Sequence, residues 1–97
     1  MNEYYLVCVK SDKFEITLCM AREIYDAVMT ALDRWRYDHV ECAAYYVVDV
    51  DGDHIIDVSK LASMLYHEEA LFTLKSKTDD RFDEEKFIRQ FIKEEMQ

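Results

Sequence analysis

Apolar and polar residues alternate near the start of the chain in the manner of β-strands. Residues 4–9 (Tyr-Tyr-Leu-Val-Cys-Val) are apolar on both faces of an extended chain, which predicts a covered, central strand. After a polar turn, Phe14, Ile16 and Leu18 alternate with polar residues, which is typical of a half-buried strand. Two strands joined by so short a turn predict a hairpin.

The next pattern has the period of an α-helix and extends over about residues 20–37. Apolar side chains recur three or four residues apart and form one stripe, while charged side chains lie on the opposite side. The stripe is wide enough to pack on a sheet. It consists of Ile24, Val28, Ala31, Leu32 and Trp35.

A second strand–turn–strand–helix pattern follows. Residues 41–50 alternate as a strand, and Asp-Gly at positions 51–52 favours the positive φ that a hairpin turn needs. Residues 54–58 predict a short return strand. Ser59 is then a suitable N-cap for a helix over about residues 60–69.

The C-terminal part combines an ambiguous segment with a well-marked helix. Residues 70–77 fit a short edge strand or extended connector slightly better than a helix end. Asp83 is a typical N-cap, and Phe82 and Phe87 are spaced as a hydrophobic staple. The apolar stripe of this last helix predicts core packing, with a seam between two copies as the alternative.

An internal echo indicates how these elements are arranged. Residues 4–9 and 45–50 share four identities in six positions, and each segment is followed by a turn, a strand and a helix. The pattern predicts one α+β domain over residues 1–97. It would contain a four-stranded antiparallel sheet from two ββα units, two helices on one face of the sheet, and a C-terminal helix.

Composition is consistent with a folded domain and gives a first indication of location. Half of the residues are apolar (51%), too many for a disordered acidic chain. No signal peptide or membrane-spanning run is recognisable, so we expect a cytoplasmic protein. Cys8, Cys19 and Cys42 show no CxxC spacing and predict reduced core thiols, with a disulfide or a zinc site as weaker alternatives.

The acidic charge is concentrated in the middle of the chain. The net charge is −9, and residues 37–74 hold eight acids and one base. Such a field repels nucleic acid and anionic membranes and attracts basic protein surfaces. Carboxylates at alternate positions of a strand lie about 6.6–6.8 Å apart, on the scale of phosphates along a nucleic acid. The predicted partner-binding residues are Glu41, Tyr45, Asp49, Asp51, Asp53, Asp57, Glu68 and Glu69, with Tyr45 as an aromatic anchor.

Metal binding and catalysis find less support in the sequence. Residues 49–53 have the alternating acids of a calcium loop, but an EF-hand in that register would need ligands where Val47 and Val58 stand. His54 and Asp57 could form an acid–base pair, yet no nucleophile or phosphate-binding motif accompanies them. We therefore expect no enzyme activity, no cofactor and no metal.

These observations favour a small acidic inhibitor that binds the basic groove of a nucleic-acid-handling protein. In size, charge and scarcity of glycine and proline, the chain resembles the small acidic proteins of phages and mobile elements, such as anti-CRISPR and anti-restriction proteins, and also immunity proteins. That resemblance assigns no role to any residue. The alternatives are an adaptor or homodimeric domain whose acidity only solvates it, and a regulator that binds a small molecule or metal near His54.

Overall fold

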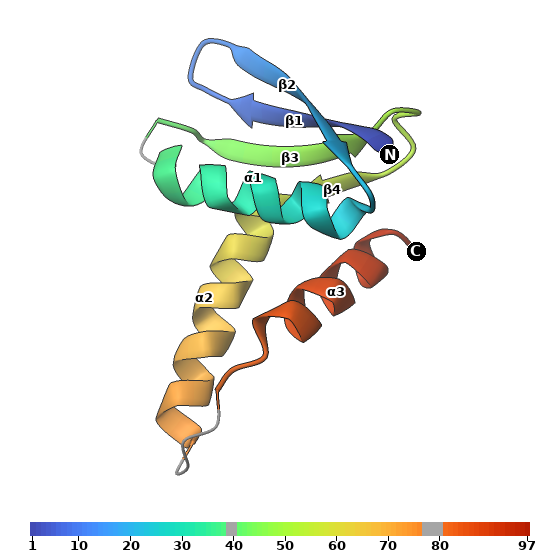
Figure 1. The fold of residues 1–97 in the computed structure, drawn as a ribbon. Helices are drawn as coiled ribbons and strands as arrows, with labels where there is room; N and C mark the ends of the chain where they lie inside the picture. Colours follow the sequence, from blue (N-terminus) through green and yellow to red (C-terminus); the bar gives the residue numbers. More distant parts are fainter. Residues whose placement is uncertain (39–40, 77–80) are drawn as a thin grey trace.

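The chain folds into a β-sheet with helices packed against one of its faces (Figure 1). This computed structural model describes residues 1–38, 41–76 and 81–97. No helix in these ranges is both long and apolar enough to cross a membrane. The elements are β1 (Asn2–Val9), β2 (Phe14–Ala21), α1 (Ile24–Asp38), β3 (Ala44–Asp49), β4 (Ile55–Asp57), α2 (Val58–Lys75) and α3 (Glu84–Glu95).

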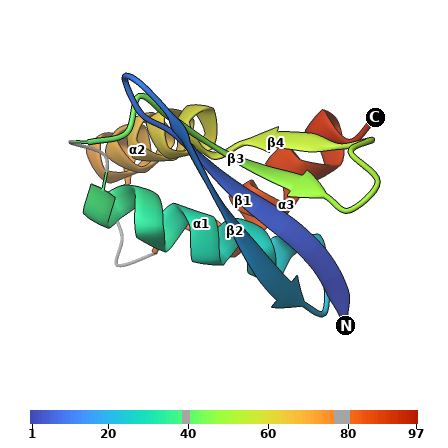
Figure 2. The ribbon, with the colours of Figure 1, turned by 90° about the horizontal axis from the view of Figure 1, so that it is seen from above.

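The sheet is antiparallel throughout, with strand order β2-β1-β3-β4. The two hairpins lie side by side, and their first strands, β1 and β3, form the centre of the sheet (Figure 2). Val9 pairs with Ala44 and Tyr4 with Asp49, so the turns of the two hairpins lie at opposite ends of the sheet. The predicted fold of two ββα units followed by a C-terminal helix is therefore confirmed.

The core lies between the sheet and the helices. Every second residue of the central strands points toward the helices and is buried, because side chains alternate between the two faces of a strand. The apolar stripe predicted for α1 lies in this core. The main buried side chains are Leu6, Val47, Val28, Ala31, Leu32, Ile56, Leu61, Leu65, Ile88, Phe91 and Ile92.

Several element boundaries differ from the predicted ones. Met20 and Ala21 continue β2, because they pair with Glu3 and Asn2, and α1 therefore begins at Ile24. β3 covers only residues 44–49 of the predicted 41–50.

The largest difference lies in α2. The prediction of an edge strand or connector over residues 70–77 is wrong, because α2 remains helical to Lys75 and ends at its C-cap, Ser76; Lys77 lies outside the described residues. The ring of Phe72 lies 5.8 Å from that of Phe82, which gives this last part of α2 a packing partner.

The predicted start of the C-terminal helix is confirmed. Asp83 is the N-cap of α3, and its Oδ1 accepts a hydrogen bond from the backbone N–H of Lys86 at 3.1 Å. The rings of Phe82 and Phe87 lie 5.9 Å apart, as a hydrophobic staple requires. Ile88 is fully buried, so this helix contributes to the core of its own chain.

The prediction of three reduced thiols is wrong. Cys8 on β1 and Cys42 before β3 form a disulfide that joins residues 34 positions apart, and only Cys19 is free. Stable disulfides are typical of oxidising environments. The cysteines therefore no longer support the expected cytoplasmic location.

Candidate functional site

The acidic tip of the second hairpin is organised by the carboxylate of Asp49. Its Oδ1 accepts hydrogen bonds from the backbone N–H groups of Asp53, at 2.9 Å, and His54, at 3.4 Å. Its Oδ2 lies 2.9 Å from Nδ1 of His54. Gly52 completes the predicted turn with a φ of +74°. Asp49 is thus occupied in holding the turn, and it is unavailable as a free contact residue.

The Asp49–His54 pair predicts a pH dependence of stability. The hydrogen bond from His54 lowers the pKa of the Asp49 carboxyl below its ordinary value of 3.8. A carboxyl whose pKa is lower in the folded state stabilises the fold above the unfolded pKa, and this contribution is lost as pH falls through the folded pKa. We expect Asp49→Asn to lower the urea midpoint at pH 7, and the difference from the wild type to narrow below pH 3.8.

The exposed carboxylate of Asp51 provides the matched control. Asp51→Asn removes the same charge from the same hairpin, and its urea midpoint should stay close to that of the wild type. Equal effects of the two substitutions at pH 7 would contradict the assigned role of Asp49.

Asp57 also has a structural role. It is the N-cap of α2, and its Oδ1 accepts hydrogen bonds from the backbone N–H of Lys60, at 3.0 Å, and from the hydroxyl of Ser59. The prediction that Ser59 is the N-cap is therefore wrong, and the helix begins at Val58. His54 contacts Asp49, as described above, and no hydrogen bond or ion pair joins it to Asp57 within the described part of the chain.

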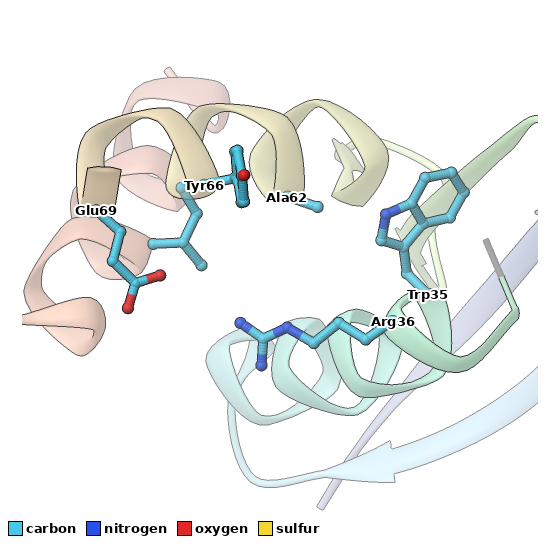
Figure 3. A pocket seen from close by; sticks show the side chains of 6 residues that line it. Trp35, Arg36, Ala62, Tyr66 and Glu69 are labelled. Atoms are coloured by element: carbon cyan, nitrogen blue, oxygen red, sulfur yellow. The ribbon is translucent and has the colours of Figure 1, made fainter. Parts of the chain in front are cut away.

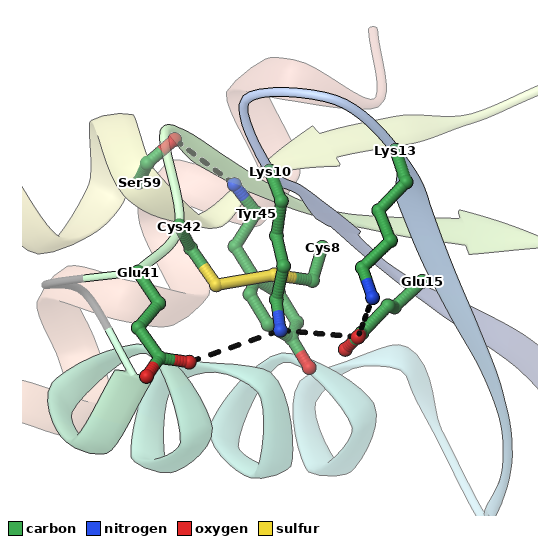
Figure 4. The surroundings of a disulfide bond; sticks show 8 residues. All are labelled: Cys8, Lys10, Lys13, Glu15, Glu41, Cys42, Tyr45 and Ser59. Carbon is green, nitrogen blue, oxygen red and sulfur yellow. Dashed lines mark hydrogen bonds and ion pairs between the residues drawn. A yellow bond between two sulfur atoms is a disulfide. The ribbon is translucent and has the colours of Figure 1, made fainter.

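Glu41 and Tyr45 lie toward the other end of the sheet, beside the disulfide (Figure 4). The side chain of Tyr45 is only 4% exposed and faces the helices, so the prediction of an aromatic surface anchor is wrong. Glu41 Oε2 lies 3.8 Å from Nζ of Lys10, which also contacts Glu15 at 3.0 Å. These groups border an open cavity of about 280 Å³. The carboxylates of Glu41 and Glu15 are thus both paired with Lys10.

Glu68 and Glu69 lie on the exposed side of α2, away from both hairpin turns. Glu69 borders a cavity of about 320 Å³ between α1 and α2, together with Trp35 and Tyr66 (Figure 3). The Arg36 guanidinium on its other side lies 3.0 Å from a carboxylate oxygen of Glu84. The cavity combines aromatic surface with two charges, and it contains no His, Cys or hydroxyl nucleophile other than the Tyr66 phenol.

The eight predicted residues therefore do not converge on one surface. Only Asp51 and Asp53 lie together at the tip with carboxylates that have no hydrogen-bond or ion-pair partner in the described ranges. His67 is exposed on α2, and His39 lies outside the described residues. In residues 1–38, 41–76 and 81–97, no group of three His, Cys, Asp or Glu side chains is placed to hold a metal ion.

Sequence reasoning missed the open face of the sheet. The helices α1, α2 and α3 lie on the other side of the sheet (Figures 1 and 2), so the described residues cover the central strand β1 on only one of its two faces. Phe14, Ile16, Leu18 and Met20 of β2 are 70%, 65%, 55% and 50% exposed. Cross-strand partners share a face, and the register adds Tyr5, Val7, Val9, Ala44, Tyr46, Val48 and Ile55 to this open face.

One signal in the sequence could have revealed this face. Both central strands carry apolar residues on both of their faces, and a sheet with helices on one side covers only one of these. The alternation of Phe14, Ile16 and Leu18 shows that they share a face. It does not show which face the helices cover.

Comparison of the chain with protein families, with curated proteins and with solved structures gave no match.

Proposed function

We propose that this chain is a non-catalytic protein-binding domain that docks the acidic tip of its second hairpin, with Asp51 and Asp53, on the basic, nucleic-acid-binding surface of another protein and excludes nucleic acid from it. The observation that carries the proposal is the charge imbalance of residues 37–74, which contain eight acidic residues and one basic residue. Small acidic inhibitors of phages and mobile elements, including anti-CRISPR proteins, are the class that the resemblance in size and charge implies. The target would then be a host nucleic-acid enzyme.

The geometry of the hairpin tip supports this role. Asp49 holds the turn in one conformation, and the carboxylates of Asp51 and Asp53 project from it without partners in the described chain. A preorganised pair of carboxylates loses little entropy when it meets Lys or Arg side chains. The net charge of −9 also speeds encounter with a basic surface by electrostatic steering.

The test is capture of basic proteins from a host lysate by the immobilised wild type and by an Asp51→Lys, Asp53→Lys variant. Asp49 is left unchanged because it holds the turn. A variant with Asp12→Lys and Glu94→Lys is the matched control, since it makes the same change in net charge at exposed positions elsewhere. Circular dichroism verifies that all three proteins fold.

We expect the wild type and the control to capture a nucleic-acid-binding protein that the tip variant loses. Added nucleic acid should release it, and binding should weaken as salt rises. Capture of the same protein by all three, with no competition from nucleic acid, would contradict the proposal.

A further inference from the structure

We propose that two copies of this chain associate face to face through the open sides of their sheets, so that β2 of one copy lies over β4 of the other. This inference does not rest on the proposed acidic docking function. It rests on the size, the lack of charge and the shape of the open face.

The open face is large enough for a dimer interface. Strands of eight, eight, six and three residues cover about 400 Å² in plan, at about 4.8 Å between strands and 3.3 Å per residue. The accessible area of protruding side chains exceeds the plan area. The plan area alone is about half of the roughly 800 Å² that each partner buries in a standard interface. Apolar patches above a few hundred Å² mark interaction sites.

The absence of charged residues at the centre of the open face is compatible with a second copy as the occupant. Two bodies with a net charge of −9 repel each other wherever their charged surfaces meet. The register places two charged residues, Glu3 and Asp57, on the open face, and both lie at its margins. The centre of the face therefore has no charged residue. Two such faces can meet without burying an unpaired charge, which would be costly.

The shape of the face is self-complementary across a two-fold axis parallel to the strands. The β2 flank carries large protruding side chains, such as Phe14 and Leu18. The opposite flank carries fewer large side chains, since β4 has only three residues and presents Ile55, while β3 presents Ala44 and Val48 beside Tyr46. Rotation about this axis places the β2 flank of each copy over the opposite flank of its partner. The result is an aligned sheet sandwich.

Pairing between two β2 edges is the competing arrangement. β2 is an outer strand of eight residues without proline or glycine, and such edges attract other strands. Edge pairing would extend the sheet and leave both apolar faces in water. Face-to-face packing removes these faces from water, and burial of apolar surface is the dominant favourable term in association.

The first test is the molar mass by sedimentation velocity over a range of protein and salt concentrations. We expect the wild type to reach twice 11.6 kDa and to dimerise more strongly at higher salt, since screening weakens the repulsion. Ile16→Lys would bury two lysines per dimer and should weaken association by roughly a hundredfold or more. Thr17→Lys changes the neighbouring residue on the other face of β2 and should still dimerise.

A cross-link distinguishes the two arrangements. Leu18 and Ile55 lie in the same row across the sheet, so the proposed axis brings Leu18 of each copy over Ile55 of its partner. In a Cys19→Ser background, Leu18→Cys with Ile55→Cys should be joined between copies by a short bifunctional maleimide. Leu18→Cys alone should not.

Three results would overturn the proposal. The first is a monomer mass at every concentration and salt condition. The second is a wild-type dimer that Ile16→Lys leaves intact. The third is a dimer in which Leu18→Cys alone cross-links as well as the double variant. Because dimerisation should strengthen with salt and acidic docking should weaken with it, failure of one proposal is distinguishable from failure of the other.

Discussion

Reduction of the Cys8–Cys42 disulfide is expected to lower the free energy of unfolding by about 4 kcal/mol, because a cross-link over about 34 residues removes that much chain entropy from the unfolded state. For a domain of this size, the loss corresponds to a fall in Tm of roughly 15–30 °C. Small domains have unfolding free energies of only about 5–15 kcal/mol. The disulfide thus supplies a large share of the stability.

The measurement is thermal unfolding by circular dichroism with and without a thiol reductant. Cys42→Ala should unfold near the temperature of the reduced wild type and should not respond to the reductant. Cys19→Ser is the matched control, because it removes the free thiol and leaves the disulfide intact. Identical unfolding temperatures for the oxidised and reduced wild type would contradict this role of the disulfide.

Features set by neighbouring residues could be predicted from the sequence. The start of α3 needs only the side chain of Asp83 and the Phe82–Phe87 contact, all within one turn of helix. The turn at Gly52 follows from Asp-Gly in the same way. The internal echo placed the two hairpins in one sheet, because it repeats the order of elements as well as their residues.

Features that depend on distant residues could not be predicted in this way. Cys8 and Cys42 form a bond because the pairing of β1 with β3 brings their Cα atoms within 6.2 Å. The α2 helix continues past residue 70, where Phe72 packs against Phe82, which comes from the segment before the next helix. Neither contact leaves a trace in local periodicity.

The candidate site shows the same division. The sequence located the acidic charge but could not separate free carboxylates from those engaged in folding. Asp49 and Asp57 bond backbone N–H groups of their own hairpin and helix, which is a common use of Asp at turns and caps. Among the described residues, the carboxylates at the tip that have no partner are those of Asp51 and Asp53. The open apolar face is a second candidate surface that depends wholly on where the helices pack.

Replacement of Ile88 by alanine is expected to lower the free energy of unfolding by about 2–5 kcal/mol, the cost of removing a large aliphatic side chain from a core. Ile88 is 0% exposed in a single copy, at the centre of the apolar stripe of α3. Gln90→Ala on the exposed side of the same helix is the control and should change the free energy by less than about 0.5 kcal/mol.

This substitution also decides between the two interpretations of the α3 stripe, as core or as a seam between copies. Burial of Ile88 within one chain means that its truncation acts on folding, so the urea midpoint should fall while the molar mass at native conditions stays that of the wild type. A seam would give the reverse, an unchanged midpoint with weakened association. For Ile16→Lys we expect the opposite result, a fall from the dimer mass to the monomer mass with the fold unchanged. The two substitutions together therefore distinguish the buried face of the molecule from the face that we assign to the partner copy.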